Sequence, residues 1–214
     1  SRVINIKKTR GQPRARTGRG KILVIDDEAE KGWEAVLQYM FKDCKFECIS
    51  ERVRDYNDFS PEARKKIESN HYDLFFLDLR LGGPVEEDVY DPKDFSGMKI
   101  LKKIKSLNKG NQVIMLTASN KSWNLKALLD AGCDGYYVKE SPEYRFSKDF
   151  TKKNYNNLFK DTYACLNKKY LKDIYSSIQN INKFLGKNSE DELFSFIIKQ
   201  LDVAFYLLTL AKTE

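Results

Sequence analysis

KILVIDDE, residues 21–28, places four apolar side chains between a lysine and three acids. An unbroken apolar run of this length is typical of a buried parallel strand, because helices cover both faces of a parallel sheet. Two later runs have the same character, DLFFLDL at 73–79 and QVIMLTA at 112–118. The three runs predict the centre of a parallel sheet, with a polar residue at the end of each strand.

Shorter segments around these runs complete an alternation of strands and helices. Two more strands are predicted at 45–50 and 134–140. Helices are predicted at 29–41, 61–69, 97–107 and 122–131. With the helical region that begins near 148, a strand is followed by a helix five times. This order favours an α/β fold with a doubly wound, parallel, five-stranded sheet.

The last third of the chain has no strand pattern. Large apolar side chains recur every three or four residues from Phe150 to Leu185, which predicts one long helix or two collinear helices over 149–185. Gly186 ends this region, and Ser189 with Glu192 has the spacing of a capping box that begins a helix over 190–212. We therefore expect an α-helical hairpin in 148–214, which we interpret as a dimerisation or output element.

The formal charge of +7 is unevenly distributed over the 214 residues. Residues 1–21 hold eight of the 38 basic side chains and no acid, so the other 30 bases nearly balance 31 acids. The segment 11–20 is rich in Gly and Arg and has no periodicity, so we interpret 1–20 as a basic flexible arm or linker. Such an arm can bind nucleic acid, but the nearly neutral remainder makes nucleic-acid binding elsewhere unexpected.

The scarce residue types exclude several classes of protein. His71 is the only histidine, which argues against Ser-His-Asp hydrolases, Cys-His proteases and histidine-rich zinc sites. The longest mostly apolar run, 203–211, has nine residues, whereas a spanning helix needs about 20, and no signal-peptide pattern is present. We expect a cytoplasmic protein without a membrane span, and the Ser at position 1 suggests a trimmed segment. Four cysteines form no CxxC pair and fit reduced thiols: Cys44, Cys48, Cys133 and Cys165.

Polar residues at the ends of the predicted strands carry the chemistry. Asp26 and Asp27 end the first strand, Asp78 the third, Thr117 the fourth and Lys139 the fifth. A strand order of 2-1-3-4-5 would bring all five to one edge of the sheet. Three carboxylates at close range require a cation, and a hard divalent ion such as Mg²⁺ suits oxygen ligands. One carboxylate could then attack a phosphorus atom, while the hydroxyl and ammonium groups bind the transferred oxygens.

Each of these residues alone is weak support, since acids after strands are common in turns and a single lysine usually faces solvent. Together with their surroundings they resemble a known family. The segments ILVIDDE (22–28), LFFLDLRLGG (74–83), VIMLTAS (113–119) and GYYVKE (135–140) are similar to the receiver domain of two-component response regulators. The resemblance covers about 22–146 and implies a flavodoxin-like sheet. The chain would then consist of the arm 1–20, a receiver domain over 21–147 and the helical extension 148–214.

The resemblance also implies a role for each site residue. Asp78 would be the phosphoacceptor, and Asp26, Asp27, Asp78 and the backbone carbonyl of Arg80 would hold Mg²⁺. Thr117 and Lys139 would read the phosphoryl group, with Tyr136 as an aromatic switch residue. The donor would be a histidine kinase or a phosphotransfer protein. Apart from self-phosphorylation and autodephosphorylation, no enzymatic activity is expected.

Two features depart from the family pattern. Glu140 follows Lys139 where the family has a proline joined by a cis bond, and Pro142 comes two residues later. A cis bond before a residue other than proline costs about 2.5–4 kcal/mol. The loop 82–95 is also longer than the family norm and rich in acids. We interpret it as a solvated acidic insertion, with a partner-selecting flap as the alternative.

Three other functions are alternatives to a receiver that signals through its C-terminal helices. A DNA-binding transcriptional regulator would use the basic arm or an absent output domain, but 148–214 shows no short recognition helix after a tight turn. A metal-dependent phosphatase typically has a DxD motif after its first strand, whereas Asp26 and Asp27 are adjacent. A phosphotransfer bundle needs a histidine, and 148–214 contains none. A helical bundle completed by homodimerisation is the favoured interpretation of this region.

Overall fold

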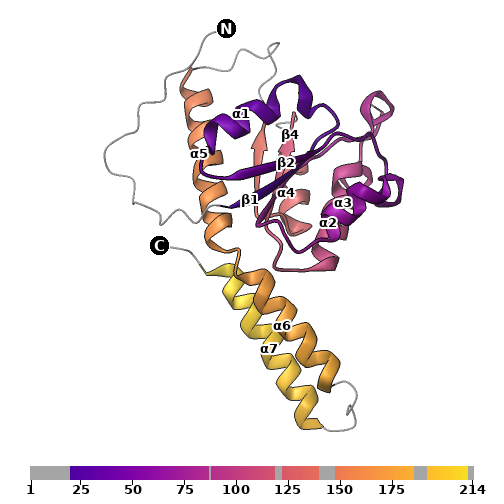
Figure 1. Cartoon of the computed structure of the whole chain (residues 1–214), viewed down its shortest axis with the longest axis vertical. Helices are drawn as coiled ribbons and strands as arrows, with labels where there is room; N and C mark the ends of the chain where they lie inside the picture. Colours follow the sequence, from indigo (N-terminus) through magenta and orange to yellow (C-terminus); the bar gives the residue numbers. More distant parts are fainter. Residues whose placement is uncertain (1–19, 87, 119–121, 140–147, 186–191, 212–214) are drawn as a thin grey trace.

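The computed structural model describes residues 20–86, 88–118, 122–139, 148–185 and 192–211. The chain forms a five-stranded parallel sheet in the order β2-β1-β3-β4-β5, as predicted (Figure 1). The strands are β1 (Lys21–Ile25), β2 (Lys45–Ile49), β3 (Leu74–Asp78), β4 (Val113–Thr117) and β5 (Gly135–Val138). The basic arm up to residue 19, the segment 140–147 with Glu140 and Pro142, and the connection 186–191 with Gly186 and Ser189 lie outside the described residues.

Helices cover both faces of the sheet. They are α1 (Trp33–Met40), α2 (Pro61–Glu68), α3 (Ser96–Leu107), α4 (Ser122–Asp130) and α5 (Lys148–Asn167). Short 3₁₀ turns lie at Ala29–Lys31, Tyr56–Asp58, Gly83–Glu86 and Pro92–Asp94. The predicted helix 29–41 is therefore interrupted at Gly32, whose φ of +121° suits only glycine. Helix α2 begins as predicted with Pro61, and the Ser60 hydroxyl accepts the N–H of Ala63.

Alternate residues of each central strand enter two separate cores. On β1, Leu23 and Ile25 pack with residues of α2, α3 and α4, while Ile22 and Val24 pack with residues of α1 and α5. This alternation follows from the two-residue period of a strand. Because both faces are covered, strands β1, β3 and β4 are almost fully buried. The unbroken apolar runs of the sequence therefore lie where a parallel sheet requires them.

Helix α5 belongs to the receiver core and is not part of the projecting hairpin. Leu158, Cys165 and Leu166 of α5 are buried in the same cluster as the sheet residues. Phe159 also stacks on Phe41 of α1, with ring centroids 5.8 Å apart. The apolar spacing of 148–167 resembles that of the helices that follow, which is why the sequence pattern groups this stretch with the helical extension. In the structure, the extension begins only after this helix.

Two further helices, α6 (Leu171–Leu185) and α7 (Glu192–Leu210), form the hairpin. Residues 168–170 form a turn, and Figure 1 shows that α6 leaves the receiver in a different direction from α5. The collinear alternative for 149–185 is therefore wrong. Phe205 and Leu201 of α7 pack against Leu171, Ile174, Tyr175 and Ile178 of α6. Among the described helices, only α7 is long and apolar enough to cross a membrane, with a mean hydropathy of 1.6, although the longest apolar run of the sequence predicted none.

The hairpin is seated at the amino ends of the strands. The Lys172 ammonium group donates to the carbonyls of Asn70 at 3.1 Å and Tyr72 at 3.0 Å and contacts the Asp73 carboxylate at 3.4 Å. Asn108 donates to the Lys172 carbonyl at 2.9 Å. Any side chain at Gly110 would collide with the backbone of Leu171, so the two backbones can meet only at a glycine. These contacts fix the start of α6 to the receiver.

Candidate functional site

The three predicted acids meet at the carboxyl end of the sheet. Asp26 and Asp27 directly follow β1, and Asp78 is the last residue of β3, the neighbouring strand. One carboxylate oxygen from each lies within 4.8 Å of those of the other two. Asp26 is 0% exposed, and the side chain of Asp27 is 3% exposed. The register of two parallel strands therefore brings together acids that are about fifty residues apart in sequence.

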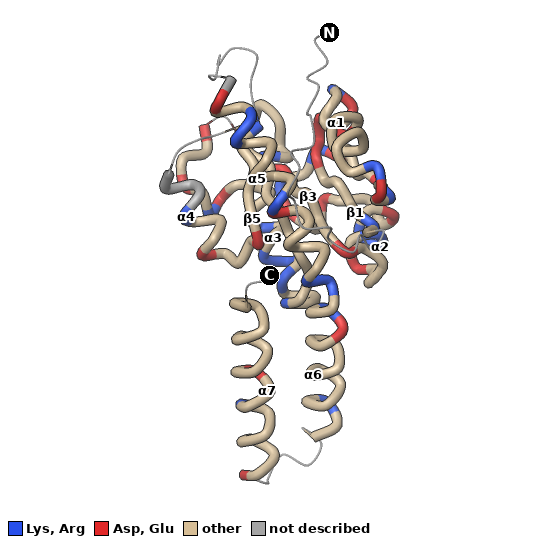
Figure 2. Tube along the Cα trace, turned by 90° about the vertical axis from the view of Figure 1, so that its left-hand side faces the viewer, with Lys and Arg blue, Asp and Glu red and all other residues tan. Residues whose placement is uncertain are grey.

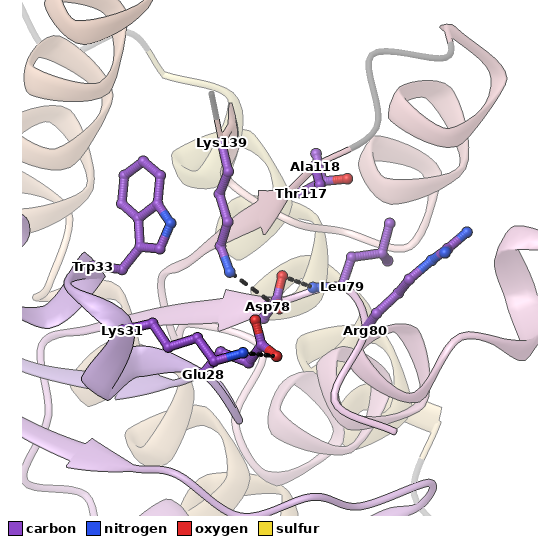
Figure 3. Close-up of a pocket in the computed structure, with 9 residues that line it drawn as sticks. All are labelled: Glu28, Lys31, Trp33, Asp78, Leu79, Arg80, Thr117, Ala118 and Lys139. Atoms are coloured by element: carbon purple, nitrogen blue, oxygen red, sulfur yellow. Dashed lines mark hydrogen bonds and ion pairs between the residues drawn. The ribbon is translucent and has the colours of Figure 1, made fainter. Parts of the chain in front are cut away.

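Lys139 joins this group from the last strand of the sheet. Its Nζ lies 2.7 Å from Asp26 Oδ2 and 3.1 Å from Asp78 Oδ2, and Figure 3 shows the side chain extending down toward Asp78. Burial alone would lower the pKa of Lys139, but the charges of Asp78 and Asp26 outweigh burial and raise it. The lysine is therefore protonated and paired with both carboxylates.

The surroundings of the Asp78 carboxyl group shift its pKa upward. Its burial raises its pKa to about 7, the Coulomb repulsion of Asp26 adds to that rise, and Lys139 opposes it. The backbone N–H of Leu79 donates to Asp78 Oδ1 at 2.9 Å. Burial likewise raises the pKa of Asp27, as do Asp26 and Glu28, while Arg52 opposes the rise from 3.3 Å. Additional positive charge nearby would therefore stabilise the ionised forms of Asp78 and Asp27.

The donor set fits a magnesium ion. Three carboxylates are offset here by two cationic side chains, Lys139 and Arg52, which leaves one negative charge in excess. Mg²⁺ prefers oxygen ligands of this kind and usually keeps several waters, so a few carboxylates are enough. Asp26, Asp27 and Asp78 would hold the ion.

Thr117 faces the same space from β4. It is the last residue of that strand and is 1% exposed. It lines a pocket of about 400 Å³ together with Asp78 and Lys139 (Figure 3). The remaining lining residues are Glu28, Lys31, Trp33, Leu79, Arg80 and Ala118. A hydroxyl, an ammonium group and a carboxylate thus border one cavity large enough for a small polyatomic anion and its waters.

The position of Asp78 depends on the start of α3. A side chain at Gly97 would collide with the Asp78 carbonyl and with the backbone of Leu79, so only glycine allows the helix to approach this closely. Ser96, the residue before it, is fully buried and donates its hydroxyl to Glu86 at 2.9 Å. The first turn of α3 therefore supports the backbone on which the site is built.

The acidic loop 82–95 is only partly a solvated insertion. Glu86 is 4% exposed and accepts the N–H of Ser96 at 2.7 Å and that of Gly82 at 3.1 Å. Its carboxylate thus ties the loop to the positive end of α3, where unpaired N–H groups favour an anion. The prediction of full solvation is wrong for this residue, whereas Asp88, Asp91 and Asp94 are exposed as expected. A role for the loop in partner selection stays a prediction.

The side chains of two predicted site residues, Tyr136 and Arg80, do not point toward the acids. Tyr136 on β5 is 36% exposed and is not among the described residues that line the pocket. Arg80 lines the pocket, but its guanidinium group lies over the Phe95 ring at 4.7 Å and extends away from Asp78 (Figure 3). Their roles as switch residue and carbonyl ligand stay predictions.

Sequence reasoning missed three residues at the site. Arg52 follows β2 and pairs with Asp27, and the position after a strand was the same signal that identified the acids. Glu28 follows the acid pair and lies 2.6 Å from Lys31. Trp33 lines the pocket and packs edge-on against Tyr137, with ring centroids 5.6 Å apart. Nothing in its spacing distinguishes this tryptophan from a core residue.

Several solved structures of response regulators are similar to this chain. Similar solved structures include a CheY-like response regulator receiver domain protein from Methanospirillum hungatei JF-1, at 23% identity and a TM-score of 0.43, covering 68% of this chain and 98% of that one. A two-component response regulator from Clostridium difficile matches at 21% identity and 0.43, covering 66% and 97%. A receiver domain protein from Clostridium thermocellum matches at 20% and 0.45, covering 70% and 93%.

A search of curated proteins gave no match. The sequence profile of the response regulator receiver domain, by contrast, matches residues 22–149. The matched stretch contains every strand of the sheet, the acidic cluster, Thr117 and Lys139. Since it makes up more than half of the 214 residues, the chain belongs to the response regulator receiver domain family.

Proposed function

We propose that this chain accepts a phosphoryl group on Asp78 from a histidine kinase or phosphotransfer protein, with Mg²⁺ bound by the acidic cluster. Receiver domains are the signalling domains of two-component systems and not classical enzymes. The contact of Lys139 with both Asp26 and Asp78 supports the proposal most strongly, because it places a cation against the proposed acceptor oxygen. An added phosphoryl group would enlarge the negative charge beside that cation.

The chemistry needs the groups that border the pocket and the Mg²⁺ that the acidic cluster would hold. An oxygen of the Asp78 carboxylate attacks the donor phosphorus and forms a P–O bond, while the bond to the leaving group breaks and that group takes a proton from solvent. Bound Mg²⁺ would supply positive charge to the phosphoryl oxygens. Lys139 binds one of those oxygens, and the Thr117 hydroxyl donates a hydrogen bond to another. Later attack by water on phosphorus releases phosphate and restores the carboxylate.

The proposed response is a change in the positions of Thr117 and Lys139 that biases an existing conformational equilibrium. The route to an output through the C-terminal helices must differ from the one that the sequence suggested. The hairpin does not continue directly from the face of α4, β5 and α5, because its seat lies at the amino ends of β3 and β4. A signal from Asp78 must therefore cross the length of the sheet or of α5.

Trp33 provides a direct readout of site occupancy, since its ring lines the same pocket as Asp78. Beryllium fluoride or acetyl phosphate, added with Mg²⁺, should change the tryptophan fluorescence of the full chain. Acetyl phosphate should also add one hydroxylamine-sensitive phosphoryl group by mass spectrometry. Asp78→Asn should abolish both effects, because the amide oxygen is a poor nucleophile.

Asp88→Asn is the matched control, since this acid is exposed in the loop and is not among the residues that line the pocket. It should behave as the wild type does. A wild-type protein that folds, binds Mg²⁺ and takes up no phosphoryl group from acetyl phosphate or from any phosphohistidine donor would contradict the proposal.

A further inference from the structure

Helix α7 carries more apolar surface than its contact with α6 can cover. Phe205 is buried and Leu201 is half-buried against α6, and these two residues mark the inner side of the helix. Eight large apolar residues of α7 remain exposed, and four of them share the side opposite Phe205: Phe196 at 58%, Val203 at 53%, Leu207 at 59% and Leu210 at 60%. Figure 2 shows fewer charged residues along the hairpin than along the receiver. Exposed apolar patches of this kind usually mark an interaction surface.

The spacing of the exposed side chains indicates what kind of partner fits. Phe196, Gln200, Val203, Leu207 and Leu210, which we call the outer stripe, are separated by four, three, four and three residues. This alternation is the a/d pattern of a coiled-coil seam, and the exposed side chains of Leu193 and Tyr206 flank it on either side. The stripe spans about 21 Å at 1.5 Å per residue. Its complement is therefore another helix of similar length.

Gln200 identifies that helix as a second copy of α7. It is exposed and lies within the outer stripe, between apolar residues four positions before it and three after it. Covering the stripe with an unrelated apolar helix would bury an amide without partners, which is costly. In a parallel, in-register pair, Gln200 faces Gln200 of the second copy, and each amide both donates and accepts. An antiparallel pair would instead place it against Val203.

A lipid bilayer is a poorer partner, although α7 is apolar enough by composition. Lys199 and Asp202 lie near the middle of α7 and would have to enter the hydrocarbon, where charged groups are costly. The attached α6 carries Lys172, Asp173 and Lys183, and Lys172 is already bound to carbonyls of the receiver. A hairpin that entered a bilayer would therefore carry Lys183, Lys199 and Asp202 into it.

We propose that two copies of this chain associate through the outer stripes of their α7 helices, packed in parallel and in register about a two-fold axis near Gln200. The four helices of the two hairpins then lie side by side in the order α6-α7-α7-α6, with both receivers at the same end. Because Lys172 and Gly110 fix each hairpin to its receiver, the pairing sets the distance and orientation of the two receivers. This association goes beyond phosphoryl transfer and does not depend on it.

The first experiment is sedimentation equilibrium of the full chain. The wild type should sediment at twice its 25.0 kDa mass. Leu207→Glu should sediment at 25.0 kDa, because it places like charges across the two-fold axis. Ser195→Glu is the matched control, since Ser195 is exposed on α7 outside the outer stripe, and it should remain dimeric. Circular dichroism establishes that each variant is folded. A folded wild type that stays monomeric at tens of micromolar overturns the proposal, as does a Leu207→Glu dimer.

The second experiment tests the orientation and the competing partner. Phe196→Cys and Leu210→Cys should each form a disulfide with its own copy on mild oxidation, beyond any background from the wild-type cysteines. In an antiparallel pair neither position meets itself, so the absence of both cross-links would overturn the parallel arrangement. Flotation of a monomeric wild type with phosphatidylcholine–phosphatidylglycerol vesicles would assign the stripe to lipid and overturn the dimer.

Discussion

Two buried lysines lie beside opposite ends of β3 and have very different partners. Lys139, near the carboxyl end, contacts the carboxylates of Asp26 and Asp78. Lys172, near the amino end, contacts the carbonyls of Asn70 and Tyr72 and the carboxylate of Asp73. Their side chains are 12% and 11% exposed, so burial does not distinguish them. The chemistry of their partners does.

The surroundings of Lys139 can accept a further cation, whereas those of Lys172 cannot. Around Lys139 the acids outnumber the cations, and the raised pKa values of Asp78 and Asp27 show that further positive charge would be favourable. Around Lys172, one acid and neutral carbonyl dipoles satisfy the ammonium group without an excess of charge. The excess of acids around Lys139 therefore suits the binding of a further cation, whereas the balanced partners of Lys172 suit a structural joint.

Removing Lys172 should have the largest effect on stability. Lys172→Met leaves the carbonyls of Asn70 and Tyr72 without this donor, while Asp73 still accepts the backbone N–H of Lys21, and the free energy of unfolding should fall by about 3 kcal/mol. Adding Mg²⁺ should restore none of this loss. Urea denaturation with and without Mg²⁺ measures it. A loss below about 1 kcal/mol would mean that water replaces the ammonium group easily, and that the joint is weaker than its contacts suggest.

Substitutions of Gly110 and Gly97, which allow close backbone contacts at opposite ends of the sheet, should have different effects on Mg²⁺ binding. Gly110→Ala forces α6 off its seat, and Gly97→Ala forces α3 away from Asp78, each at a cost of about 1–3 kcal/mol. Only Gly97→Ala should also weaken Mg²⁺ binding, because only its neighbour is an acid of the cluster. Calorimetric titration of both variants with Mg²⁺ tests this difference. Equal Mg²⁺ affinities in the two variants would contradict the proposal that only the carboxyl end of the sheet binds the ion.

Lys139→Met should be less harmful than Lys172→Met, and Mg²⁺ should offset its effect. Without the lysine, Asp78 can take up a proton, so the expected loss is only about 1–2 kcal/mol near pH 7.5 in EDTA. Excess Mg²⁺ should recover most of it by supplying the missing charge. Thermal denaturation in EDTA and in Mg²⁺ provides the measurement, with Lys172→Met as the control that Mg²⁺ does not rescue.

The smallest expected effect is a pH-dependent stabilisation by Asp78→Asn in metal-free protein. Burial raises the pKa of Asp78 in the folded state to about 7, above its usual 3.8, so the ionised group disfavours folding at pH 8. The wild type gains stability as the pH falls from 8 through 7 toward 4. The variant should therefore be about 1 kcal/mol more stable at pH 8, and this advantage should shrink as the pH falls below 7 and vanish near pH 3.8, the usual pKa of the unfolded group. An advantage that stays constant between pH 7 and pH 4 would assign it to something other than ionisation.

The sheet and the acidic cluster were predictable because local residue patterns determine them. The runs around Leu23, Phe76 and Met115 are apolar without interruption, and a parallel arrangement then forces Asp26, Asp78 and Thr117 to one edge. No such signal existed for Lys172, a single lysine in a helix whose acceptors lie about 100 residues earlier. The partners of a buried polar group depend on tertiary contacts, which periodicity does not encode.

The allocation of helices was harder to predict than their existence. Apolar residues recur at the same spacing in α5 and α6, but those of α5 pack on the sheet and those of α6 pack on α7. Spacing indicates that a helix has an apolar side and does not indicate which surface that side will contact. Glu86 shows the same limit, since an acid-rich loop reads as solvated until the N–H groups of Ser96 and Gly82 are found beside it.

The position of β3 at the centre of the sheet bears on how fast its two ends can communicate. It is paired on both sides, with β1 and β4, and its apolar residues are at most 1% exposed. Such strands exchange their amide hydrogens only when the whole domain opens, so we expect the amides of β3 to be among the slowest to exchange in the chain. Local melting between Asp78 and the hairpin seat is then far too slow to relay a signal. Movement at one end should reach the other as the shift of a stiff body, within the microseconds to milliseconds of collective motions.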